Sequence, residues 1–182
     1  MKAVRLRAAS AAFTMIELVI AMAVAATLFA IALPSYARYI AEQRLLNEAR
    51  RLSEAIMLAR SEAVKRNRHV VICAATPGVP CGDVGHWHGG WVMFEDENGD
   101  ADQDPSDPVI DVDVAAAAGV TAVGNRPVER YLRFDHMGQA RMASGALQMG
   151  TIEVCKRGLT GYRVVLANTG RTRIDRTAGP CP

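Results

Sequence analysis

The stretch FTMIELVIAMAVAATLFAIAL, residues 13–33, decides the fold of this chain. It contains 21 residues and a single charged side chain, that of Glu17. A helix of about 20 apolar residues spans the hydrocarbon core of a bilayer, so the stretch predicts a membrane-spanning helix. A carboxylate inside such a helix is costly in lipid unless it is paired. Glu17 therefore predicts a positively charged partner, which need not belong to this chain.

The twelve residues before this stretch, MKAVRLRAASAA, carry three bases and no acid. This arrangement predicts a cytoplasmic N-terminus, with the rest of the chain across the membrane. One interpretation is a secretory signal peptide cut near residues 30–32, but the apolar cores of such signals run about 7–15 residues and lack a charge. A second is a plain single-span anchor, which leaves Glu17 unexplained.

A third interpretation comes from resemblance. A basic leader, a small residue and the motif F-T-x-I-E-L before an apolar run resemble the class III signal of type IV pilins and type II secretion pseudopilins. The resemblance implies that a prepilin peptidase cuts between Ala12 and Phe13 and that the new amine is N-methylated. It also implies that Glu17 pairs with the N-terminal amine of a neighbouring subunit. Ala12 stands where the family nearly always has Gly.

Length and charge limit the possible functions. A chain of 182 residues fits an anchor and one domain. Without the leader, the chain has 18 bases and 19 acids, a net charge of −1. Any nucleic-acid binding must therefore depend on a local cluster of bases. We expect a leader over 1–12, a transmembrane and fibre-core helix over 13–34, its amphipathic continuation over 35–68 and a globular β-rich domain over 69–182.

The second half of the predicted helix carries one apolar stripe. Pro34 is expected to kink or locally open the helix, and a Pro near this position is also a pilin feature. The stripe recurs every three or four residues and should pack on a sheet. Its members are Leu45, Ala49, Leu52, Ile56, Ala59 and Ala63.

From residue 69 onward the apolar period becomes strand-like. Turn residues separate the apolar segments, and strands after one helix predict an α+β, pilin-like fold, with the helix packed on an antiparallel sheet. The segments are 69–74, 90–95, 109–114, 130–135, 150–156, 162–167 and 171–176. The stretch 102–126 matches no motif, and Ala115–Ala118 is expected to be loop.

A motif in the middle of the chain narrows the resemblance. The pattern W-x-x-G-W-x-x-F-x-D-x-N-x-D, over residues 87–100, is similar to that of GspH/FimT-type minor pilins and pseudopilins. Its Asp96, Asn98, Asp100 and Asp102 alternate like the oxygen ligands of a calcium loop. Ala101 stands where such a loop needs Gly, so we favour a solvated hairpin turn and leave calcium as the alternative.

Other ligand patterns are weaker. His86 and His88 lie near Cys81 and Asp83 but lack the spacing of a zinc site, so no metal or other cofactor is expected. No nucleophile triad, P-loop or carboxylate pair is recognisable, and we do not expect an enzyme.

The four cysteines follow the predicted membrane span, which favours an oxidising compartment and two disulfides. Of the three possible pairings, local proximity favours Cys73–Cys81 and Cys155–Cys181. The second link should tie the last strand to the body of the domain.

The last motif is basic. Alternation along a strand places Arg171 and Arg173 on one face, about 6.6 Å apart, with Ile174 towards the core. Two guanidinium groups at this spacing suit phosphates. Some FimT-type proteins carry a G-R-x-R motif here and bind DNA during natural transformation, so the resemblance implies non-specific contact with double-stranded DNA. The candidate residues are Arg171, Arg173, Arg176, Lys156 and Arg157. The alternative is a solvated strand edge protected by charge.

The favoured function is therefore a FimT-like minor pilin that assembles with other pilin subunits through its N-terminal helix and binds DNA. Before assembly it should span the bacterial inner membrane once, with its C-terminal domain in the periplasm. A GspH-type pseudopilin of a secretion machine, with a structural role and no DNA binding, is the alternative. An anchored periplasmic enzyme is a third hypothesis without a catalytic motif.

Overall fold

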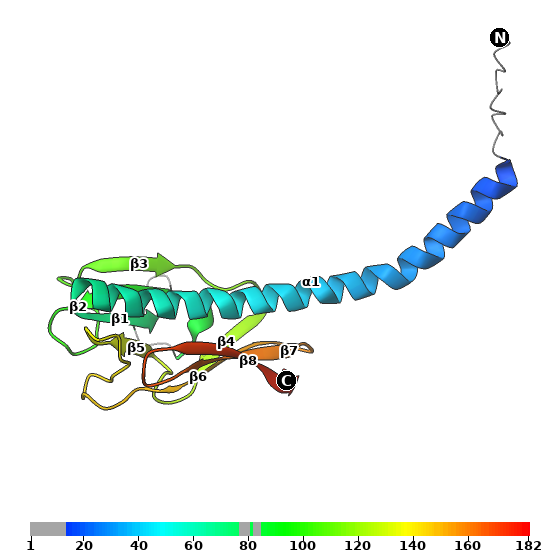
Figure 1. Ribbon diagram of the computed structural model, residues 1–182. Coiled ribbons are helices and arrows are strands. Elements are labelled where there is room, and N and C mark those ends of the chain that lie inside the picture. The colour runs from blue at the N-terminus through cyan, green and yellow to red at the C-terminus, as the bar shows by residue number, and fades with distance from the viewer. Residues whose placement is uncertain (1–13, 77–80, 82–84) are drawn as a thin grey trace, which may run out of the picture. The chain divides into compact units, whose positions relative to one another are not determined.

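The structure, a computed structural model, describes residues 14–76, 81 and 85–182. Over these residues, one long helix, α1 (Met15–Arg66), precedes a short 3-10 helix and eight strands (Figure 1). The chain divides into two compact units, of which the first ends at Ala41 and the second begins at Glu42.

The first unit is the apolar part of α1. Its large apolar side chains are exposed, from Met15 to Leu33. By length and composition α1 is able to cross a membrane. The helix continues through Pro34 without a break, so of the kink or local opening expected there, a local opening is not present. A proline removes one backbone hydrogen bond, and the bonds of neighbouring turns hold the rest of the helix together.

The second unit contains two antiparallel sheets of four strands each. The first has the order β3-β2-β1-β5, and its strands in that order are Val109–Asp113, Trp91–Asp96, His69–Ala74 and Tyr131–Phe134. The second has the order β4-β6-β7-β8, and its strands in that order are Val120–Gly124, Gly150–Lys156, Thr160–Leu166 and Thr172–Pro180. The 3-10 helix η1 covers Trp87–Gly89.

The apolar stripe of α1 is part of the hydrophobic core. All six of its predicted members are at most 2% exposed. Polar contacts also join α1 to both sheets. Arg51 Nη1 donates to Asp113 Oδ1 at 2.9 Å in the first sheet, and Ser53 Oγ lies 2.7 Å from Thr172 Oγ1 in the second. The stripe thus packs as the sequence predicts, but against two sheets.

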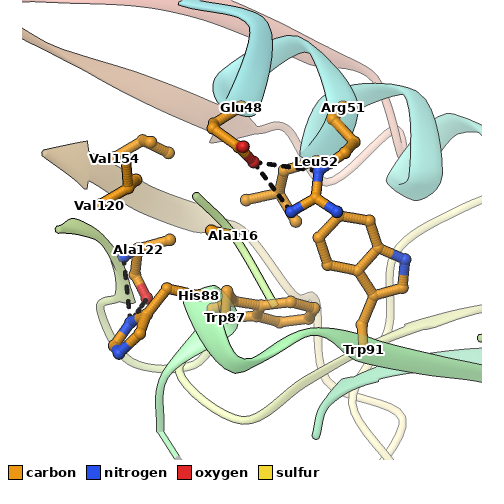
Figure 2. A pocket seen from close by; sticks show the side chains of 10 residues that line it. All are labelled: Glu48, Arg51, Leu52, Trp87, His88, Trp91, Ala116, Val120, Ala122 and Val154. Carbon is orange, nitrogen blue, oxygen red and sulfur yellow. Dashed lines mark hydrogen bonds and ion pairs between the residues drawn. The ribbon is translucent and has the colours of Figure 1, made fainter. Parts of the chain in front are cut away.

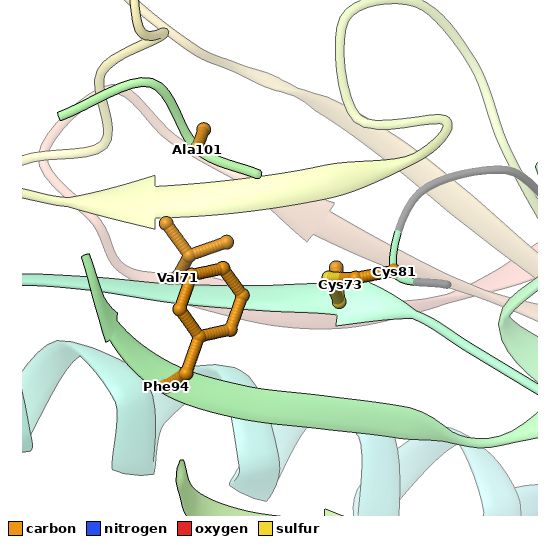
Figure 3. Close-up of a cluster of buried hydrophobic side chains, with 5 residues drawn as sticks. All are labelled: Val71, Cys73, Cys81, Phe94 and Ala101. Atoms are coloured by element: carbon orange, nitrogen blue, oxygen red, sulfur yellow. A yellow bond between two sulfur atoms is a disulfide. The ribbon is translucent and has the colours of Figure 1, made fainter. Parts of the chain in front are cut away.

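A second apolar cluster lies around β1 (Figure 3). It consists of Val71, Cys73, Cys81, Phe94 and Ala101, with Val92 and Tyr131 packed against it. Ala101 is 4% exposed and has a φ of 67°, in the left-handed region that favours glycine. The acidic loop after β2 therefore folds back onto the sheet and buries one of its own side chains.

Candidate functional site

The candidate site is the basic strand β8 at the edge of the second sheet. Within the second sheet, β8 is an outer strand that pairs with β7. Arg173 lies opposite Val165, and Ile174 lies opposite Val164. Opposed residues point to the same face of a sheet. Val164 is buried, so Ile174 lies on the inner face, whereas Arg173 is directed outward and exposed.

The turn before β8 fixes the position of Arg171. The Ala167 N–H donates to the Arg171 carbonyl at 2.9 Å, which closes the β7–β8 hairpin. Gly170 within it has a φ of 77°, and a Cβ there would meet the Gly138 carbonyl, so only glycine fits. Arg60 Nε of α1 donates to the same carbonyl at 2.9 Å. The exposed Arg171 thus stands on an anchored turn.

The structure brings only part of the predicted basic set together. Arg176 opposes the buried Tyr162 and Lys156 opposes the buried Val120, yet Arg176 itself is exposed and Lys156 is half-buried. The Arg176 guanidinium lies 5.9 Å from the Tyr162 ring. Because the pleat has a period of two, these two bases do not share the strand face of Arg173, and their proposed contact with DNA stays a prediction.

The outer face of the second sheet is mixed in charge. Arg173 Nε contacts Asp175 Oδ2 at 3.0 Å. One row of the sheet places Arg163 between Glu153 on β6 and Asp175 on β8. Sequence reasoning missed Arg163 as a member of this face, because the strand pairing that places it there cannot be read from its own segment. Arg157 is exposed in the turn after β6.

The acidic loop is organised by its own hydrogen bonds. Asp96 Oδ1 accepts from the Gly99 N–H at 2.7 Å, and Asp96 Oδ2 accepts from Arg133 Nε at 2.9 Å. Asn98 donates to Asp100 and Asp104. Both oxygens of the first proposed calcium ligand thus have protein partners. Among the described residues, no group of three or more acidic, His or Cys side chains is arranged to hold a metal. β2 and β3 pair antiparallel, so the loop over residues 97–108 connects a hairpin, although it is longer than a tight turn.

The Trp motif lines a small, partly open space of about 10 Å³ (Figure 2). Trp87 and Trp91 wall it from below and Leu52 of α1 from above. The Trp87 indole donates to the Val128 carbonyl at 3.0 Å, and the Arg51 guanidinium lies 4.8 Å from the Trp91 ring. This space suits about one water molecule, so the motif packs the helix on the sheets and forms no ligand pocket.

Two disulfides have the pairing that sequence proximity favours. Cys73 bonds Cys81 and Cys155 bonds Cys181, each with a Cα–Cα distance of 5.7 Å. The second bond holds the chain immediately after β8 to β6.

At the start of α1, Glu17 accepts hydrogen bonds from the Thr14 N–H and Oγ1, both at 2.9 Å. Its side chain is exposed, so it is open to an additional partner. The predicted processing site, Ala12–Phe13, lies outside the described residues.

A long helix with an exposed apolar half, packed by its second half on antiparallel sheets, defines a pilin-like protein. The family model for Type II transport protein GspH matches residues 48–170, about two thirds of the chain. The chain therefore belongs to the GspH family, within the type IV pilin and pseudopilin superfamily.

Solved structures share this fold. One is the crystal structure, in space group P21, of the type IV minor pilin FimU of Pseudomonas aeruginosa, strain PAO1. Its sequence identity to this chain is 22% and its TM-score is 0.53, and the match covers 75% of this chain and 92% of that chain. A second crystal structure of the same protein, in space group P65, has 21% sequence identity and a TM-score of 0.51. This match covers 72% of this chain and 92% of that chain. No curated protein sequence matches the chain.

Proposed function

We propose that the chain is a minor pilin of a type IV pilus. The exposed apolar half of α1 carries this proposal, because its side chains from Met15 to Leu33 need either lipid or the helices of other subunits. After cleavage by a prepilin peptidase and N-methylation of Phe13, the helix leaves the inner membrane and enters a fibre core. The second unit lies on the periplasmic side before assembly.

Glu17 provides the test of assembly. Its carboxylate neutralises the N-terminal amine of a neighbouring subunit in the apolar fibre core, so Glu17→Val leaves that amine unpaired. We expect Glu17→Val to be processed normally but to be lost from sheared filaments. Thr27→Val is the matched control, since Thr27 Oγ1 donates to the Val24 carbonyl of its own helix. Equal recovery of both variants would contradict the assembly proposal.

The finer proposal is that Arg171 and Arg173 contact double-stranded DNA for uptake in natural transformation. Both are exposed at the open edge of the second sheet, and the anchored hairpin holds their backbone. Two guanidinium groups two residues apart are spaced by about 6.6 Å, which allows each to contact a phosphate. Phosphate contacts carry little sequence information, so binding is non-specific.

A binding assay on a fragment beginning at Tyr36 tests this contact. We expect a dissociation constant of about 10⁻⁴ to 10⁻⁶ M for duplex DNA. Arg171→Gln with Arg173→Gln removes most of the binding. The matched control is Lys156→Gln with Arg176→Gln, which removes the same charge at strand positions opposite the buried Val120 and Tyr162 and leaves most of the binding. Undiminished binding by the Arg171/Arg173 variant refutes the contact.

A second candidate function is a minor pseudopilin of a type II secretion machine. The family model favours it by its description, and the matched residues end at 170, directly before the Arg171 motif. Deletion of the gene distinguishes the two functions. Loss of DNA uptake with normal protein secretion supports the minor pilin, whereas loss of secretion with normal uptake supports the pseudopilin.

A further inference from the structure

The two sheets end in open edges of opposite charge. β3 is the outer strand of the first sheet and β8 the outer strand of the second, and in the described part of the chain no further strand pairs with either. In Figure 1 the two strands lie on opposite sides of α1 within the second unit. Unpaired strand edges present backbone donors and acceptors that favour pairing with another chain.

The side chains along these edges are complementary in type and spacing. The first edge ends in DVD, residues 111–113, followed by Val114, and the second begins with TRI, residues 172–174, preceded by Arg171 in the hairpin turn. Each alternates charged and less polar residues with the period of two that a strand requires. Pairing the two stretches places an acid opposite a base at both charged positions, whether the strands run parallel, with 111 opposite 171, or antiparallel, with 111 opposite 173.

The first edge also exposes apolar area that a partner strand would cover. Val112 is 62% and Val114 71% exposed. Asp113 already forms an ion pair with Arg51, whereas Asp111 is exposed. An ion pair with a second copy would therefore stabilise Asp111 more than Asp113. On the second edge, the exposed ion pair of Arg173 with Asp175 contributes little and is readily exchanged.

We propose that the β3 edge of one copy of this chain pairs with the β8 edge of a second copy. The occupant is a second copy because this chain itself carries both complementary sequences. One molecule cannot pair its own two edges, because they lie on opposite sides of α1 (Figure 1). Added strands gain main-chain hydrogen bonds, and the alternating charges select the partner.

The contact is heterologous, since each copy offers a different edge to each neighbour. Heterologous contacts that do not close into a ring produce rows of subunits. Every row then has one terminal copy whose Arg171 and Arg173 are uncovered. If these arginines contact DNA, which rests on the proposed function, only that terminal copy binds it.

Charge exchange tests the contact on the full chain in detergent micelles, with sedimentation velocity at low ionic strength. We expect Asp111→Arg and Arg173→Asp each to weaken self-association at least about tenfold, because like charges then face each other. An equimolar mixture of the two variants associates again, since each supplies the charge that the other lacks. Asp102→Arg with Arg126→Asp, two exposed sites outside β3 and β8, is the matched control and leaves association unchanged.

The proposal is overturned if either single variant associates as strongly as the parent chain. It is also overturned if the equimolar mixture associates no more than each variant does alone. Association through the apolar helices alone gives the same sedimentation for all variants and also overturns it. None of these outcomes involves DNA, so the result is independent of the DNA assay.

Discussion

Arg133 donates from Nε to Asp96 Oδ2 at 2.9 Å, and the two side chains are only 8% and 0% exposed. Arg133 lies on β5 and Asp96 at the end of β2, where the acidic loop begins. Arg133 Nη1 also donates to the Met142 carbonyl at 3.4 Å. This buried ion pair connects the acidic loop to the first sheet and to the segment after β5.

Loss of the Asp96 charge should destabilise the domain strongly. We expect Asp96→Asn to lower the free energy of unfolding by about 3–5 kcal/mol, because the guanidinium of Arg133 stays buried without its counter-charge. Urea denaturation of a fragment beginning at Tyr36 measures the change. Asp100→Asn, an exposed acid of the same loop, is the control and should cost much less. Similar costs for both variants would contradict the role given to the pair.

The Cys155–Cys181 bond should stabilise the end of the second sheet. It spans 26 residues, and replacing both cysteines by serine should cost about 3 kcal/mol. Amide hydrogen exchange in β8 should accelerate more than in β1, because the lost link is local to the last strand. Uniform acceleration across both sheets would show that the bond acts on global stability alone.

His69 should make stability depend on pH. Burial lowers the pKa of His69, and the nearby positive charge of Arg133 lowers it further. The folded state then binds fewer protons than the unfolded state, whose His has a pKa of about 6.5. Stability is complete above this value and falls as the pH drops below it. His69→Gln should remove this part of the slope, measured by urea denaturation between about pH 7 and 5; an unchanged slope would be contrary to this account.

Salt dependence should separate charge from geometry at Arg171 and Arg173. Each phosphate contact contributes a slope of about −0.9 in log affinity against log salt, so the double Gln variant loses about 1.8. The double Lys variant keeps the slope but binds less well than the parent, because lysine lacks the bidentate fork. Fluorescence anisotropy with duplex DNA at several salt concentrations gives both quantities. Equal affinity of the Lys variant and the parent would exclude bidentate contacts.

The sequence predicted local features well and the arrangement of strands less well. The stripe from Leu45 to Ala63 was correct because a helical period is a local property of the chain. β4 was missed because VTAVG, residues 120–124, is short, rich in small residues and next to an alanine run. The separation of strands into two sheets depends on pairing between distant segments, which no single segment encodes.

The same limit applies to the candidate site. Arg171 and Arg173 are both exposed, Arg173 through the alternation of β8 and Arg171 in the turn before it. The pairing of Arg176 with Tyr162 and of Lys156 with Val120 appears only in the strand register, so the sequence alone does not show it. The Arg133–Asp96 pair joins residues 37 positions apart, so no spacing rule predicts it.

The mass of the mature chain recovered from sheared filaments tests the central claim most directly. The pilin interpretation predicts cleavage between Ala12 and Phe13, leaving 170 of the 182 residues with an N-methylated Phe13 and the apolar helix intact. A mature terminus near Ser35, with the apolar helix removed, would instead identify an ordinary signal peptide and contradict assembly through this helix.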